Sequence, residues 1–120
     1  MIKIKIGEQK PLNYTLKVKS TGLPVNLVNS TIVFQIKENE NQVSDFLCEK
    51  FITETSNPDE DGQIIDAQNG RFFIFLKRED TINLDINKDY YYTIWRYFGN
   101  IKEVISSSGM KIEEFIVCPD

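Results

Sequence analysis

The sequence predicts an antiparallel β-sandwich of about seven to nine short strands. Apolar and polar residues alternate with a period of two along most of the 120-residue chain, which is the pattern of half-buried strands. Turn-forming residues separate these stretches, and no long stretch keeps the apolar spacing of an amphipathic helix. With 41% hydrophobic and 12% aromatic residues, the composition is globular, so residues 1–120 are expected to form one domain.

The first strands are expected near the N-terminus. Ile2 and Ile4 alternate with lysines, and lysines often protect an edge strand against unwanted pairing, so this stretch is the candidate edge. Residues 7–11 break the pattern, and a second strand is expected over residues 14–18. Residues 20–24 contain glycine and proline and predict a turn.

A third strand is expected over residues 32–37, where Ile32, Phe34 and Ile36 alternate with other residues. The segment from residue 38 to residue 62 is less regular. Its apolar residues between 43 and 55 fit one helical turn or an irregular edge strand. Because a helix needs its apolar stripe sustained over a longer window, a strand is the prediction.

The second half of the chain carries clearer signals. Asn69-Gly70 predicts a type I′ hairpin turn that pairs residues 63–67 with residues 71–77. The most aromatic strand is expected over residues 90–98. The turn pair Gly99-Asn100 returns the chain over residues 101–106. A bend at residues 107–109 and a last strand over residues 110–117 complete the prediction.

Charge and hydropathy exclude two classes of partner. The chain has 18 acidic and 14 basic residues and a net charge of −4. Without a basic stripe, it is not expected to bind nucleic acid. No stretch reaches the roughly 18 to 20 apolar residues of a membrane span. The alternating N-terminus lacks the apolar run of a signal peptide, so the cytosol is the expected place of synthesis and folding.

Catalysis is not expected either. The chain has no histidine, which removes the usual general base and every nucleophile–histidine pair. Glu103, Glu113 and Glu114 are expected on solvated strand faces. Cys48 is interpreted as a buried or half-buried structural thiol, and Cys118 as an exposed thiol near the terminus; their separation fits no metal-binding pattern. No cofactor is expected.

One loop partly matches a calcium-binding pattern. Asn57, Asp59, Asp61 and Gly62 occupy the first, third, fifth and sixth positions of an EF-hand loop. The twelfth position is Gln68, which has no carboxylate, and the flanks do not predict helices. A solvated loop is therefore the interpretation.

The aromatic strand carries the most informative pattern. Alternation places Tyr90, Tyr92 and Ile94 on one face and a second row on the other. The second row consists of Tyr91, Thr93, Trp95 and Tyr97. The outward row is either a contact surface or is covered by loops and the 38–62 insertion. Tyr91, Trp95 and Tyr97, with the edge residues Ile2 and Ile4, are the candidate interface residues.

Several short sequence motifs together point to a known family. Thr21-Gly22-Leu23-Pro24-Val25-Asn26-Leu27 stands between two expected strands, and Asn69-Gly70-Arg71-Phe72 and Tyr90-Tyr91-Tyr92-Thr93-Ile94 follow later. From about Tyr14 to Val117, the chain resembles the N-terminal domain of phage baseplate upper proteins and related structural domains of tailed phages and prophages.

The resemblance implies an immunoglobulin-like β-sandwich that serves as an assembly part of a virion. It implies homo-oligomerisation or docking to tail, baseplate or head proteins, and a location in the bacterial cytoplasm during assembly and then in the virion. The alternative is a carbohydrate-binding or adhesion module that uses the aromatic row. A flat, uncovered Trp–Tyr pair flanked by polar groups would favour sugar, whereas an apolar rim would favour protein.

Overall fold

The computed structural model describes residues 2–5, 9–18, 21–39, 46–85 and 87–113; the side chains of residues 2–5, 10 and 104–113 lie outside this description. The elements are β1 (Ile2–Lys5), β2 (Lys10–Thr15), β3 (Ser30–Lys37), β4 (Cys48–Ile52), β5 (Gly62–Asp66), η1 (Ala67–Asn69), β6 (Arg71–Leu76), α1 (Arg78–Thr81), β7 (Tyr90–Phe98) and β8 (Ile101–Glu113).

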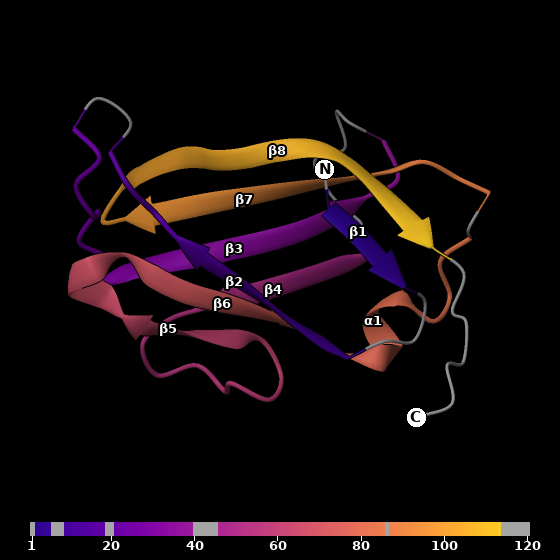
Figure 1. The fold of residues 1–120 in the computed structure, drawn as a ribbon, viewed down its shortest axis with the longest axis horizontal. Coiled ribbons are helices and arrows are strands. Elements are labelled where there is room, and N and C mark those ends of the chain that lie inside the picture. Colours follow the sequence, from indigo (N-terminus) through magenta and orange to yellow (C-terminus); the bar gives the residue numbers. More distant parts are fainter. Residues whose placement is uncertain (1, 6–8, 19–20, 40–45, 86, 114–120) are drawn as a thin grey trace.

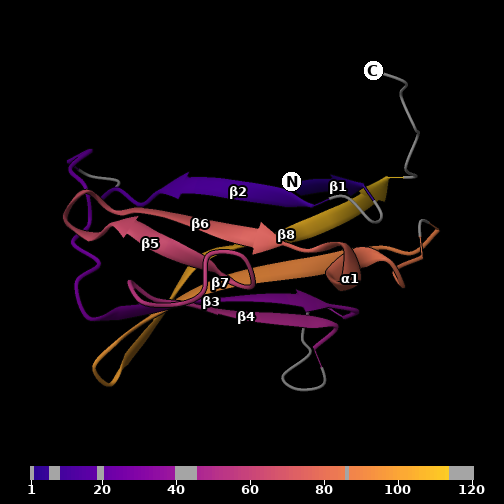
Figure 2. The ribbon, with the colours of Figure 1, turned by 90° about the horizontal axis from the view of Figure 1, so that it is seen from below.

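The strands form two layers (Figure 1). One sheet has five strands in the order β1-β8-β7-β3-β4, and the other has three in the order β2-β6-β5. Figure 2 shows β2, β5 and β6 stacked over the layer that contains β3, β4 and β7. The predicted β-sandwich, with eight strands in the described part of the chain, is confirmed.

The strand order has a known counterpart. Immunoglobulin strands are named by letters, and here β2 and β3 correspond to B and C, β4 to C′, and β5, β6, β7 and β8 to D, E, F and G. With these letters, the smaller sheet has the order B-E-D, and the larger sheet has the order G-F-C-C′ after β1. This order contains the B-E-D and G-F-C sets of immunoglobulin domains, with a C′ strand added as in the variable type. At the start of β7, the Tyr90 hydroxyl accepts a hydrogen bond of 2.7 Å from the backbone N–H of Asp85. A tyrosine at that corner, bonded to the backbone a few residues upstream, is a feature of the same domains.

The core forms where the two sheets face each other. Strand β3 contributes its inward row, β6 contributes alternate residues, and β7 contributes the row that begins at Tyr90. The fully or nearly fully buried members are Ile32, Phe34, Ile36, Phe72, Ile74, Leu76, Tyr90, Tyr92 and Ile94. Ring stacking between Tyr14 and Phe72, with centroids 5.4 Å apart, extends this packing along β2 and β6. The other β7 row, which begins at Tyr91, therefore faces away from the core.

Strand β1 departs from the predicted antiparallel arrangement. It lies at the edge of the five-stranded sheet and pairs with β8 in parallel, with Ile2 opposite Met110 and Ile4 opposite Ile112. The expectation of a wholly antiparallel sandwich is therefore wrong at this strand. No turn links two strands from opposite ends of the described chain, so no hairpin geometry sets their relative direction. The side chains of Ile2 and Ile4 lie outside the described residues.

Strand β2 begins earlier than predicted. It spans Lys10–Thr15 and includes Pro11, where a break over 7–11 and a strand over 14–18 were expected. Proline is tolerated because β2 is an edge strand, with β6 as its single neighbour in the sheet. The described part of the turn expected over residues 20–24 agrees with the prediction, because Lys17 bridges to Pro24 and Gly22 has a positive φ of 70°; residue 20 lies outside the described residues.

The hairpin of β5 and β6 is paired as predicted, but its turn differs. Residues Ala67–Asn69 form a 3-10 turn, and Gly70 closes it with a left-handed φ of 68°. The Asn69 side-chain amide donates a 2.8 Å hydrogen bond to the Asp66 carboxylate. This side-chain bond stabilises a longer loop, so the two-residue type I′ turn is wrong.

The uncertain segment and the C-terminal strand can also be compared with the predictions. Strand β4 confirms the strand predicted within residues 43–55, whereas residues 40–45 lie outside the described residues. The bend predicted at residues 107–109 is wrong, because the backbone of β8 continues through them. Irregularity occurs earlier, where Ile94 pairs with Ser106 and Trp95 with Val104, which leaves one extra residue in β8.

A buried ion pair ties α1 to the edge of the five-stranded sheet. The Lys50 side chain is 6% exposed, and its Nζ lies 2.6 Å from the Asp80 carboxylate. The same ammonium donates to the carbonyl oxygen of Glu60 at 2.7 Å. Asp80 also accepts a 2.8 Å bond from the backbone N–H of Lys77 at the start of α1. Strand β4, α1 and the loop before β5 thus meet at one cation.

Replacing Lys50 tests this junction. Lys50→Met leaves the Asp80 carboxylate without its cation in a largely buried site, and breaking such a pair costs about 3 kcal/mol of unfolding free energy. Lys88→Met is the matched control, because its pair with Glu38 is more than half exposed on both sides and such pairs contribute little. Urea unfolding of the two variants measures the difference; equal midpoints would contradict the role given to Lys50.

Two glycines provide a second test of the fold. A Cβ on Gly62 would lie 2.1 Å from the Phe73 carbonyl oxygen, and the φ of Gly62 is +106°. A Cβ on Gly22 would meet nothing within 4 Å, although its φ is +70°. Gly62→Ala should therefore lower the melting temperature far more than Gly22→Ala, which bears only the backbone strain of about 1 kcal/mol. Equal thermal shifts would show that β5 does not approach β6 this closely.

Candidate functional site

The outward side of the five-stranded sheet carries an organised set of side chains, here called the outer face. Register places them in three rows across β8, β7, β3 and β4. The first row is Lys102, Tyr97 and Thr31; the second is Trp95, Val33 and Phe51; the third is Thr93, Gln35 and Glu49. The middle row is apolar, and the two outer rows carry the polar groups.

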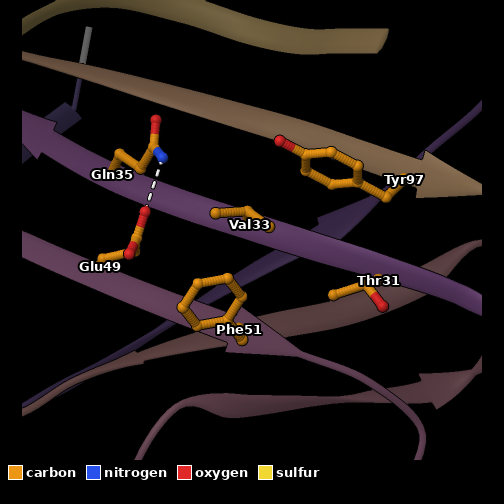
Figure 3. A pocket seen from close by; sticks show the side chains of 6 residues that line it. All are labelled: Thr31, Val33, Gln35, Glu49, Phe51 and Tyr97. Carbon is orange, nitrogen blue, oxygen red and sulfur yellow. Dashed lines mark hydrogen bonds between the residues drawn. The ribbon is translucent and has the colours of Figure 1, made fainter. Parts of the chain in front are cut away.

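A hollow of about 260 Å³ opens on this face. It is lined by Thr31, Val33, Gln35, Glu49, Phe51 and Tyr97. Figure 3 shows Val33 between the rings of Tyr97 and Phe51, with Gln35 and Glu49 together at one end. Val33 is 3% exposed, whereas Phe51 is 52% exposed. The hollow therefore has an apolar floor and a half-exposed aromatic ring at its rim.

Hydrogen bonds cross three strands beside the hollow. The indole Nε1–H of Trp95 donates to Oε1 of Gln35 at 3.1 Å. The Nε2 of Gln35 then donates to the Glu49 carboxylate at 2.7 Å, as Figure 3 also shows. These bonds hold the nearly buried amide in one orientation. They also place the negative charge of Glu49 at the β4 side of the outer face.

A cation covers the aromatic pair at the opposite side. Lys102 Nζ lies 4.1 Å from the ring centroid of Trp95 and 5.5 Å from that of Tyr97. Ammonium groups at such distances interact with the negative faces of the rings. The β8 side of the outer face is therefore positive, and the Trp–Tyr pair is not a bare platform.

The predicted aromatic row is brought to one side of the sheet. Tyr91, Trp95 and Tyr97 are all partly exposed there. Tyr91 lies apart from the hollow, opposite Lys37, with the buried Thr93 between it and Trp95.

The prediction missed the residues that complete the outer face. Val33 and Gln35 alternate with the core residues of β3, which was a usable signal. Lys102 lies opposite Tyr97 across the predicted turn at Gly99-Asn100 and could have been found by counting from that turn. Phe51 lay in the segment whose structure was ambiguous.

The loop that resembled a calcium site is closed by its own backbone. The carbonyl oxygen of Asn57 accepts N–H groups from Glu60, Asp61 and Gly62 at 3.0 to 3.3 Å. Its side-chain oxygen accepts the N–H of Asp59 at 2.9 Å. Among the described residues, no three carboxylate or thiol side chains gather where they could hold a metal ion.

Of the other ionisable groups singled out from the sequence, Cys48 and Glu103 are described, and neither lines the hollow. Cys48 is buried, as predicted. Burial, with the nearby Asp80 carboxylate, raises the pKa of its thiol to about 12, so it remains protonated at neutral pH. Glu103 forms an ion pair of 2.8 Å with Arg96. Glu114 and Cys118 lie outside the described residues, as does the side chain of Glu113.

Neither helical element in the described part of the chain has the length or apolar character needed to cross a bilayer.

Comparisons with known proteins find structural likenesses among solved structures, where nine chains match. No protein-family model matches the chain, and no curated protein matches it significantly. Among solved structures, the N-terminal domain of phage TP901-1 ORF48 is similar, with a TM-score of 0.46 and 12% sequence identity. The similarity covers 94% of this chain and 84% of that one.

The raised pKa of Cys48 predicts a pH dependence. An ordinary thiol ionises near pH 8.5, so between that pH and about 12 the unfolded chain loses a proton that the folded chain retains. Stability is therefore full below pH 8.5 and falls as pH rises through this window. In a Cys118→Ser background, Cys48→Ala should reduce that fall, as measured by urea unfolding at pH 8 and pH 10. An identical pH dependence with and without Cys48 would contradict the assignment.

Proposed function

We propose that the protein is a structural component of a phage or prophage virion and acts through protein–protein contacts made by the outer face. The observation that carries the contact role is the apolar middle row. Trp95, Val33 and Phe51 lie side by side on a sheet surface over which no second layer packs among the described residues. Apolar side chains gathered on one exposed face are typical of interaction sites. The virion assignment is supported by the resemblance of its short sequence motifs to those of phage structural domains.

Protein is a better partner than sugar for this face. A stacked sugar needs a free aromatic surface and polar groups around it. Here the Lys102 ammonium already lies over the Trp95 ring, and the indole N–H is bonded to Gln35. Phe51, half exposed at the edge of the hollow, offers only apolar contact. The covered Trp95 ring and the exposed apolar ring of Phe51 therefore favour a protein surface.

Binding also fits the chemistry of the hollow better than catalysis does. The lining contains one carboxylate, Glu49, and one phenol, Tyr97. The carboxylate is bonded to the amide of Gln35, the lining holds no second acid, and the Thr31 hydroxyl lies at the other end of the hollow (Figure 3). General acid–base work needs paired groups positioned around a reacting atom. We assign the face to recognition and the protein to no reaction.

In this proposal, the chain folds in the bacterial cytoplasm during assembly and ends in the particle. Its partners are other virion proteins of the tail, baseplate or head, further copies of itself included. The outer face supplies the contact, and the edge strand β1 is available for a second one, because its outer side carries no paired strand among the described residues.

Fractionation of particles tests the proposed function. After prophage induction in the bacterium that produces the protein, particles are separated from soluble protein on a density gradient and probed by mass spectrometry. The chain is expected in the particle band at a fixed ratio to the major structural proteins. Its presence in the soluble fraction alone, in cultures that produce intact particles, would contradict the proposal.

The sugar-binding alternative is tested with the purified protein. A glycan array is expected to show no binding above that of a Trp95→Ala variant. Selective binding of one glycan that this variant loses would overturn the preference for protein contacts.

A further inference from the structure

We propose that the outer face binds a second copy of this chain, so that two molecules pair through their five-stranded sheets about a twofold axis. This inference rests on the proposed function, because it names the partner of the same face. The observations that carry it are the positions of two opposite charges and of the apolar row between them.

The charges stand at opposite corners of the outer face. Lys102 ends the first row on β8, level with Tyr97 and Thr31. Glu49 ends the third row on β4, level with Gln35. Three strand spacings and four residues separate them, which is roughly 20 Å across the sheet. The apolar middle row lies between the two corners.

This diagonal makes the face complementary to itself. In a twofold interface, every contact occurs twice: if residue i of the first copy contacts residue j of the second, then residue j of the first copy contacts residue i of the second. An axis in the plane between two such faces can pass over the midpoint of the diagonal, between Val33 and Trp95. It then places Lys102 of each copy opposite Glu49 of the other. Both ion pairs form at once, on either side of an apolar centre.

The same axis gives the half-exposed aromatic ring a partner. Phe51 lies on β4 in the middle row, and the rotation carries it to the region of Tyr97 and Thr31 of the other copy. That region borders the other copy's hollow, which Tyr97 and Thr31 help to line. The ring that is 52% exposed in one molecule would therefore be covered by an aromatic side chain in the pair.

The resulting packing belongs to a known class. The diagonal from Lys102 to Glu49 crosses the strands at about 45°. The twofold axis is perpendicular to this diagonal, so it also crosses the strands at about 45°. The strands of the two copies then cross at close to a right angle, as in orthogonal sheet packing. Four strands by three rows give less than the roughly 800 Å² per partner of a standard interface. A weak, reversible dimer with a micromolar or higher Kd is the expectation, and it should weaken with salt.

Charge reversal provides the first test. Sedimentation velocity of the full chain, over a range from micromolar to about 0.5 mM, is expected to show a monomer–dimer equilibrium. Lys102→Glu alone and Glu49→Lys alone should each weaken it at least about tenfold, because like charges then meet at both corners. The double variant restores opposite charges and should return to within about threefold of the wild type.

Matched controls separate this effect from a general change in charge. Arg71→Glu and Glu54→Lys make the same changes at exposed positions outside the outer face and should leave dimerisation unchanged. Circular dichroism confirms that each variant is folded. If a reversal does not fold, Phe51→Ser replaces it, since loss of the half-exposed ring should also weaken the dimer.

Cross-linking identifies the contact directly. A zero-length carbodiimide reagent joins amines to carboxylates that touch, and roughly 20 Å within one chain is beyond its reach. A peptide that links Lys102 to Glu49 is therefore expected only between copies. Mixing unlabelled and ¹⁵N-labelled protein should give it in mixed-isotope form.

The outcomes decide between the pair and its alternatives. The inference would be overturned by a monomer at every concentration or by open-ended association. A dimer whose Kd is unchanged in both charge-reversal variants would overturn it too. So would a cross-link that joins Lys102 to a different protein in purified particles, and that result would leave the proposed function standing. Conversely, a dimer with charge rescue in a protein that is absent from particles would support the pairing and contradict the virion role.

Discussion

Strand β3 buries side chains on both of its faces, but a second sheet covers only one of them. Its inward row packs against the three-stranded sheet. Its outward row includes Val33 and Gln35, which are 3% and 8% exposed. Their neighbours in the register, Trp95, Tyr97, Glu49 and Phe51, have to provide that cover. The position of β3 between β7 and β4 in the larger sheet therefore determines which residues surround it on the outside.

This arrangement explains why the outer face is both ordered and incomplete. The bonded set of Trp95, Gln35 and Glu49 satisfies the polar groups that would otherwise be costly beside an apolar floor. The ring of Phe51 contributes cover but remains half exposed itself, and the hollow beside it is open. A partner that completes the burial gains apolar contact on a surface whose side chains are already held in place, which lowers the entropy cost of binding.

The sequence predicted the layers better than the connections. Period-two alternation identified β3, β6 and β7 because each has one row in the core. It could not give the direction of β1, since that depends on which distant strand lies beside it. It also missed Pro11 inside β2, which is acceptable only at an edge. For the site, the aromatic row was predictable, but the Lys102 cation and the Phe51 ring reach it through pairing with β7 and β3, which no local pattern encodes.

We propose the outer face as the surface through which this domain is assembled. Hydroxyl-radical footprinting tests it most directly, by comparing oxidation in the dilute isolated protein with oxidation in purified particles. Phe51 and Tyr97 should be protected in the particle, while Ile65, 57% exposed on the other sheet, should be oxidised to the same extent in both. Equal oxidation of Phe51 and Tyr97 in the two states would contradict the account.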